Sequence, residues 1–252
     1  MRYTLFFIFI SNILFSQELK TIIYLIPGQG SDYRIFKNIT INDEYETKII
    51  NYTTPEAGWN MKQFATSLSS QIDTSRNFII IGVSLGGMLA TEMSEFLRPE
   101  KVIIISSAKC RNELPFRYRF QKSIPIYKLF SGNMLKKGAF ITQPIVEPDR
   151  NKEKETCVSM LKNKDPIFLK RTVSMIINWD KKTCNEKIVH IHGKKDHTIP
   201  IKNVDQDYSI EKGSHMMVLT KGQELSTLLN SILKKDELNF CFFNINYIFT
   251  DY

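Results

Sequence analysis

The sequence predicts an α/β domain: a mostly parallel β-sheet with helices on both faces and an inserted, mainly helical cap. Apolar runs of strand length alternate with helical periodicity over the first hundred residues, and the same rhythm returns near residue 188. Strands that alternate with helices are typical of parallel sheets. Residues 82–86 also read Gly-x-Ser-x-Gly between an apolar run and a helical pattern, as in a sharp strand-to-helix turn. The 252 residues are enough for one such domain.

The first elements follow from their apolar patterns. Thr21–Ile26 is expected to be a buried strand that ends in the flexible turn Pro27–Gly30. Ser31 or Asp32 is suited to cap a short helix through Phe36. Three further strands and two helices follow by the same criteria. They are strands Thr47–Tyr52, Phe78–Ile81 and Val102–Ile105, and helices Asn60–Ile72 and Leu85–Leu97, the last stopped by Pro99.

The rhythm breaks over residues 110–182, where no convincing core strand occurs. Prolines and glycines are expected to break residues 116–146 into short helical pieces. Asp165 and Pro166 are a cap and a first-turn proline for a helix that runs to about Trp179. An insertion after a strand lies over the edge where open α/β sheets bind ligands. Residues 110–182 are therefore predicted to cap a pocket.

The core is expected to comprise residues 17–109 and 183–235. Ile188–His192 and Tyr208–Ile210 are predicted strands, and Gly222–Leu233 is the last helix. Residues 236–252 form an aromatic tail without a helical pattern, and no role is assigned to it.

Residues 1–16 are expected to be an export signal. Arg2 precedes the apolar run Leu5–Ile10, and Ser16 is suited to a cleavage site. The stretch is too short to span a bilayer, and it lacks the alternation of a half-buried strand, which is the alternative. A periplasmic or secreted protein is predicted, with a cytoplasmic location as the alternative.

The composition and charge of the chain indicate which classes of partner it could bind. Hydrophobic residues make up 42% and charged residues 24% of the chain, as in globular proteins. The net charge is +8, and residues 109–182 hold 17 basic and 7 acidic residues, a local +10. This segment suits an anionic substrate or an anionic membrane surface, or it is simply a solvated helical face. No nucleic-acid-binding motif occurs, so no such partner is predicted. Composition says nothing of the oligomeric state.

Four cysteines lack metal-ligand spacing, and none lies in the Gly-x-Ser-x-Gly context. They are Cys110, Cys157, Cys184 and Cys241. A disulfide framework is not implied for a chain of this size, and neither a metal nor an organic cofactor is predicted.

Ser84 lies at the centre of the motif, between Gly82 and Gly86, whose small size a crowded turn requires. A serine nucleophile needs a base and an orienting acid, and in this kind of sheet they follow in the order serine, acid, histidine. Asp196 follows one predicted strand and His215 follows the next, at the same sheet edge as Ser84.

Other histidines and carboxylates are less well placed. His190 lies within a strand and is expected to be packed in the interior, and His192 to bond loop backbone. His197 is expected at the surface. Asp205 and Asp207 precede or begin a strand, so Asp196 is preferred.

The backbone N–H groups of Leu85 and Gln29 are the predicted donors to a developing oxyanion. Leu85 follows the serine at a helix start, and Gln29 lies in the turn after the first strand.

These motifs resemble the α/β-hydrolase superfamily from about Thr21 to Leu233. The matching pieces are Pro27-Gly28-Gln29-Gly30, Gly82-Val83-Ser84-Leu85-Gly86-Gly87, His192-Gly193-Lys194-Lys195-Asp196 and Gly213-Ser214-His215. The resemblance implies an esterase-like or lipase-like serine hydrolase that cleaves a small-molecule ester or thioester through an acyl-serine. It implies Ser84 as nucleophile, Asp196 as acid, His215 as base, and Gln29 and Leu85 as oxyanion donors.

Two features depart from the superfamily pattern. Pro27-Gly28 replaces the usual His-Gly, and the first two strands of the full-length fold have no counterpart. A lyase or acyltransferase of the same fold, or a non-catalytic binding protein, is the alternative function.

Overall fold

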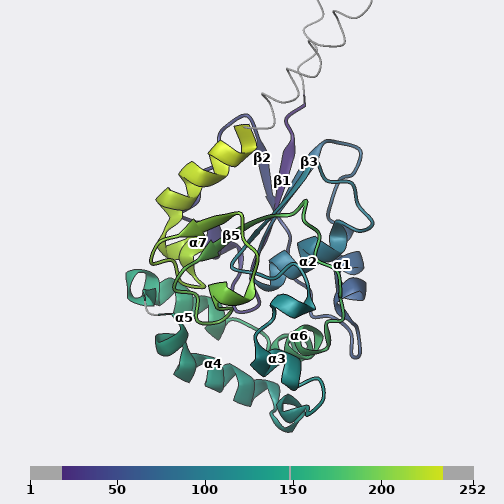
Figure 1. Ribbon diagram of the computed structural model, residues 1–252, viewed down its shortest axis with the longest axis vertical. Coiled ribbons are helices and arrows are strands. Elements are labelled where there is room, and N and C mark those ends of the chain that lie inside the picture. The colour runs from purple at the N-terminus through teal and green to yellow at the C-terminus, as the bar shows by residue number, and fades with distance from the viewer. Residues whose placement is uncertain (1–18, 148, 235–252) are drawn as a thin grey trace, which may run out of the picture.

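A computed structural model describes residues 19–147 and 149–234, so the predicted signal (1–16) and the aromatic tail (236–252) lie outside the described residues. Its sheet has six strands in the order β2-β1-β3-β4-β5-β6, and every neighbouring pair is parallel. The predicted parallel sheet is confirmed (Figure 1). The strands are β1 Ile22–Ile26, β2 Glu46–Ile49, β3 Phe78–Val83, β4 Lys101–Ile105, β5 Val189–Gly193 and β6 Tyr208–Ile210.

Helices cover both faces of the sheet, because successive side chains of each strand point to opposite sides. In β1, Ile22 and Tyr24 pack into one core cluster with α1, α2 and α6, whereas Ile23 and Leu25 pack into a second cluster on the other face. Figure 1 shows α1 and α2 on one side of the sheet, and α7 with the helix of residues 222–234 on the other. The other helices of the core, besides that of residues 222–234, are η1 Tyr33–Phe36, α1 Met61–Ser69, α2 Leu85–Met93, η5 Ile201–Asn203 and α7 Met217–Thr220. None of the helices in the described ranges combines the length and apolar character needed to cross a bilayer.

Residues 110–182, which we call the inserted segment, are helical between β4 and β5. The elements are η2 Arg111–Glu113, α3 Phe116–Phe120, η3 Ile126–Leu129, α4 Gly132–Val146, η4 Arg150–Glu153, α5 Lys154–Lys162 and α6 Pro166–Asn178. The expected start of α6 is confirmed, since the Asp165 side chain accepts hydrogen bonds from two backbone N–H groups of its first turn.

The expectation of short pieces throughout residues 116–146 is wrong for α4, which runs through Gly138 and Pro144. Pro144 lies in the last turn, where its missing N–H and its ring disturb only the end of the helix. At the other end, a Cβ on Gly132 would lie 2.1 Å from the carbonyl oxygen of Pro166, so glycine permits α4 to approach α6 closely.

A disulfide joins Cys110 to Cys184, which the sequence analysis did not expect. Cys110 follows β4 and Cys184 precedes β5, so the bond ties together the two ends of the inserted segment. The two cysteines are 74 residues apart in sequence and become neighbours only because β4 and β5 are adjacent strands. Cys157 is a free, buried thiol.

The bounds of several elements differ from the predicted ones by one to four residues, most of all in α2 and β2. The helix after Ser84 ends at Met93 rather than Leu97, because Glu95 and Phe96 donate to carbonyls three residues back and the last turn tightens. The second strand is Glu46–Ile49 rather than Thr47–Tyr52, because its partner β1 ends shortly beyond the residues that pair with it.

Candidate active site

Ser84 lies in the sharp turn between β3 and α2. Its backbone has φ 53° and ψ −118°, in a region that non-glycine residues seldom adopt. The turn is crowded: a Cβ on Gly82 would lie 2.3 Å from the Gly86 carbonyl oxygen, and one on Gly86 2.2 Å from that of Ile26. Both glycines are therefore required by close backbone contact, and they hold Ser84 at the carboxyl edge of the sheet.

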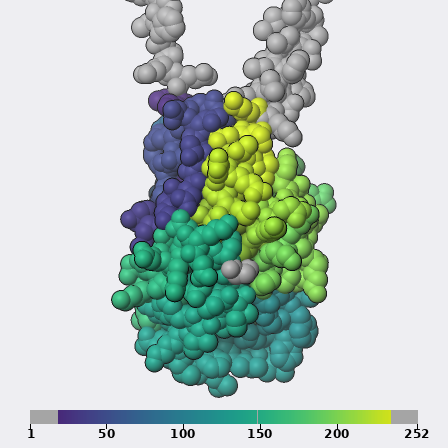
Figure 2. All heavy atoms as spheres, turned by 90° about the vertical axis from the view of Figure 1, so that its left-hand side faces the viewer, coloured from purple at the N-terminus to yellow at the C-terminus, as the bar shows by residue number. Residues whose placement is uncertain are grey.

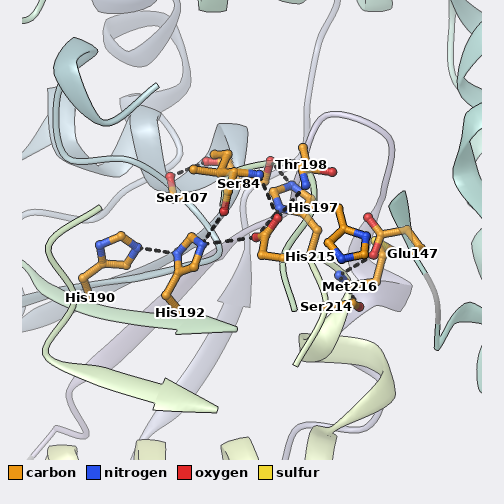
Figure 3. A network of polar contacts seen from close by, with 12 residues as sticks. Ser84, Ser107, Glu147, His190, His192, His197, Thr198, Ser214, His215 and Met216 are labelled. Atoms are coloured by element: carbon orange, nitrogen blue, oxygen red, sulfur yellow. Dashed lines mark hydrogen bonds and ion pairs between the residues drawn. The ribbon is translucent and has the colours of Figure 1, made fainter. Parts of the chain in front are cut away.

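The structure brings Ser84, His215 and Asp196 into one hydrogen-bonded line. Figure 3 labels Ser84 and His215 within this polar network. His215 Nε2 lies 2.8 Å from Ser84 Oγ, and His215 Nδ1 lies 2.7 Å from Asp196 Oδ2. With a proton on Nδ1, the imidazole donates to the carboxylate and accepts the serine hydroxyl proton at Nε2. This is the arrangement that activates a serine hydroxyl.

Asp196 is held by three hydrogen-bond donors and lies close to a fourth polar group, His192. Its Oδ1 accepts from the backbone N–H groups of Thr198 at 2.8 Å and Ile199 at 2.7 Å, and its Oδ2 faces His215 and, at 3.3 Å, His192 Nε2. Burial by itself opposes ionisation, but the charge of His215 and the hydrogen bonds from His192 and His215 outweigh it, so the pKa of Asp196 is held well below its usual value. The carboxylate is therefore ionised and aimed at the imidazole.

The His215 side chain is 11% exposed. Burial by itself would lower the pKa of His215, but the charge and the hydrogen bond of Asp196 raise it by more, and the nearby carboxylate of Glu147 adds to the increase. Asp196 therefore stabilises the imidazolium that would form when His215 takes a proton.

The other three histidines lie where the sequence analysis expected. His190 and His192 are fully buried, and burial, followed by the charges of His192 and Lys109, lowers the pKa of His190 to about 3. His192 Nε2 donates to the Ile199 carbonyl at 2.8 Å, as a structural imidazole does. His197 is exposed.

Asp207, the rejected carboxylate, instead accepts from the backbone N–H of His190 at 2.7 Å. It thus secures the start of β5 rather than the imidazole of His215.

The predicted oxyanion donors belong to two segments that adjoin Ser84. Leu85 is the first residue of α2, and a first helical N–H has no partner within its own helix. A Cβ on Gly28 would lie 3.4 Å from the Ser84 Cβ, which places the Pro27–Gly30 turn beside the serine. The Gln29 side chain donates to Thr172 Oγ1 at 2.7 Å, which secures this turn to α6. The role of both N–H groups stays a prediction.

Glu147 is a site residue that the sequence analysis missed. It follows α4, is 5% exposed, and accepts from the backbone N–H of Met216, next to His215, at 3.0 Å. Burial raises the pKa of Glu147 to about 7, with the charge of His215 opposing and that of Asp196 adding to the increase. No motif surrounds this residue, so nothing in the sequence singles it out.

A cavity of about 680 Å³ lies over Ser84, within the size range of small-molecule sites. The loops after β1, β3 and β5 and the inserted segment contribute to its walls. Its lining includes Gln29, Ser84, Arg117, Ile145, Glu147 and His215. In residues 19–147 and 149–234, no three His, Cys, Asp or Glu side chains are grouped to hold a metal ion.

Comparison with known proteins extends these findings. The model of a family described as "Uncharacterised protein family (UPF0227)" matches residues 40–212. No curated protein matches the chain.

Many solved structures share the fold. A hydrolase from Pseudomonas aeruginosa PA01 has a TM-score of 0.65 at 13% identity, with 85% of this chain and 90% of that chain covered. An esterase from Exiguobacterium antarcticum has a TM-score of 0.64 at 16% identity, with 85% and 92% covered. The enol-lactonase from Burkholderia xenovorans LB400 has a TM-score of 0.65 at 13% identity, with 86% and 92% covered. At such identities the similarity shows the fold, which is the predicted α/β-hydrolase fold.

Proposed function

We propose that this chain, which belongs to the Uncharacterised protein family (UPF0227), is a serine hydrolase that cleaves a carboxylic ester or thioester through an acyl-serine intermediate. The observation that carries the proposal is the hydrogen-bonded line from Ser84 through His215 to Asp196, with Ser84 on a strained turn. An idle serine needs neither the strain nor an imidazole aimed at its hydroxyl.

In this proposal His215 Nε2 takes the Ser84 proton as Oγ attacks the substrate carbonyl. Asp196 holds the Nδ1–H tautomer and stabilises the imidazolium. The N–H groups of Leu85 and Gln29 donate to the oxyanion, and loss of one such donor typically costs ~3–4 kcal/mol of transition-state stabilisation. His215 then returns the proton to the leaving alcohol or thiol, and water releases the acyl group by the same steps.

The cavity supports an ester with an apolar acyl group. Many of the side chains that line the cavity are apolar; they include Ile35, Met88, Leu114, Ala139, Leu161 and Ile176. The last four belong to the inserted segment, which we propose acts as a cap. The structural neighbours include proteins named as an esterase and an enol-lactonase, both of which imply acyl–oxygen chemistry.

The test combines fluorophosphonate labelling with a panel of p-nitrophenyl esters of increasing chain length. Ser84→Ala should abolish labelling and lower kcat by roughly 10⁶-fold, the usual cost of losing the triad serine. Ser70→Ala, on the exposed end of α1, is the matched control and should leave both unchanged.

Wild-type turnover in Ser84→Ala would refute the proposal. A wild-type protein that neither labels nor turns over any ester would refute it too, in favour of a binding protein. Labelling at Ser84 without hydrolytic product would favour a lyase or acyltransferase.

A further inference from the structure

Exposed apolar side chains are concentrated in residues 114–146, which include α3, η3 and α4. In the described part of the chain, thirteen large hydrophobic side chains are exposed, and nine of them fall in this stretch. Leu129 is 80% exposed, Ile141 74% and Ile145 72%. Single exposed apolar residues are ordinary, but a concentration of them marks a surface that binds a partner or a membrane.

Every charged residue of the same stretch is basic. Residues 114–146 contain six basic residues and no acidic residue, a net charge of +6. Five of the six are exposed. Lys136 donates to the carbonyl oxygens of Lys162 and Lys164, and Arg117, although exposed, donates to those of His197 and Thr198. The exposed ones are Arg117, Arg119, Lys122, Lys128 and Lys137.

Apolar and basic side chains occur together on the exposed parts of α3 and α4. On α4, Met134, Lys137, Ile141 and Ile145 are spaced i, i+3, i+7 and i+11, which places them in one exposed row. On α3, the exposed rings of Phe116 and Phe120 lie 5.5 Å apart. A helix face that combines large apolar residues with lysine and arginine is typical of the membrane–water interface.

This surface lies at one end of the molecule. Figure 1 shows α3 and α4 at the end opposite the start of β1, and in Figure 2 the inserted segment, in teal, makes up the lower end below the helix of residues 222–234. Leu129, Ile141 and Ile145 are exposed there, so a flat partner can reach them.

We propose that this surface, residues 114–146, which we call the docking face, binds an anionic lipid bilayer. Charge complementarity favours a bilayer over a second copy of the chain, because two docking faces would bring +6 against +6. A bilayer also accepts scattered apolar side chains without the shape complementarity that a protein interface needs.

The docking face adjoins the mouth of the cavity over Ser84. Arg117, Thr142 and Ile145 line that cavity and are also exposed. A bound protein would therefore take an acyl ester directly from the lipid surface, and this part of the inference rests on the proposed function. Docking itself does not depend on catalysis.

Co-sedimentation of the full chain with phosphatidylcholine vesicles, with and without phosphatidylglycerol, tests the proposal. Lys122→Gln/Lys128→Gln/Lys137→Gln should weaken binding to phosphatidylglycerol vesicles by roughly 100-fold, from the usual contribution of each cation near an anionic surface. The matched control removes the same charge elsewhere on the surface and should bind like wild type. It combines Lys62→Gln, Lys187→Gln and Lys202→Gln, all exposed.

A second pair tests the apolar contribution. Leu129→Ser/Ile141→Ser should lower binding by roughly 10-fold or more, because two large side chains no longer enter the interface. Phe96→Ser, exposed but outside the docking face, should have no effect. Thermal melts show that each variant is folded.

Equal loss of binding in the docking-face variants and their controls would overturn the proposal. Equal binding to the two vesicle types would also overturn it. A third refuting result is a protein that binds no vesicles but forms a dimer, which the docking-face variants convert to a monomer. The Ser84→Ala protein separates the two proposals: it should sediment like wild type, and ester turnover without sedimentation would overturn docking alone.

Discussion

Replacement of the carboxylate of Asp196 by an amide tests the hydrogen-bonded line directly. In Asp196→Asn, the new amide has one acceptor oxygen and one NH₂ donor in place of two acceptors. The acceptor belongs on the Oδ1 side, where the backbone N–H groups of Thr198 and Ile199 converge at 2.8 and 2.7 Å. The NH₂ group then faces His215 Nδ1, at the 2.7 Å position of the present Oδ2.

This orientation reverses the tautomer of the base. Facing a donor, His215 Nδ1 becomes the acceptor and its proton moves to Nε2, where it points at Ser84 Oγ. An Nε2–H imidazole cannot accept the serine proton. The same change in serine protease triads lowers kcat by roughly 10⁴-fold, which is about 5 kcal/mol of transition-state stabilisation.

Steady-state hydrolysis of a p-nitrophenyl ester measures kcat. Active-site titration with a fluorophosphonate gives the enzyme concentration. Asp207→Asn is the matched control, because its amide oxygen can still accept from the backbone N–H of His190. It should keep kcat within a factor of a few of wild type. A kcat for Asp196→Asn within about 10-fold of wild type would refute the inferred roles of Asp196 and His215.

Two further predictions concern groups that the structure adds to the site. Glu147→Gln keeps an acceptor for the backbone N–H next to His215 but removes a carboxyl group, with a pKa of about 7, whose ionised form raises the pKa of His215. The pKa of His215 should therefore fall. Because the neutral imidazole is the active form, the acidic limb of the kcat/KM pH profile should move to lower pH. A shift to higher pH would contradict the electrostatic argument. Reduction of the Cys110–Cys184 disulfide should lower the free energy of unfolding by about 4 kcal/mol, the loop-closure contribution for its 74-residue separation. Urea unfolding with and without reductant measures this, and the Cys110→Ala/Cys184→Ala variant should not respond to reductant.

The central strands of the sheet were predictable because they are buried on both faces. Runs such as Ile22–Ile26 and Phe78–Val83 contain almost only apolar residues, and the structure buries every residue of both. Helix and strand ends were less predictable, as in α2 and β2, because they depend on where a neighbouring element stops. The length of α4 was unpredictable for the same reason. Its first turn packs against α6, which is distant in sequence, and a local pattern does not show this contact.

The sequence by itself determined the order of Ser84, Asp196 and His215 after successive strands, because parallel topology brings the ends of all strands to one edge. Only the tertiary structure decided their distances, the buried carboxylate of Glu147, the disulfide and the single basic, apolar surface of residues 114–146. Each of these depends on contacts between residues far apart in the chain. The hydrophobic and charge patterns of a local stretch do not indicate which distant residues it contacts. Strand and turn patterns, by contrast, arise from interactions between neighbours, so they can be recognised along the chain.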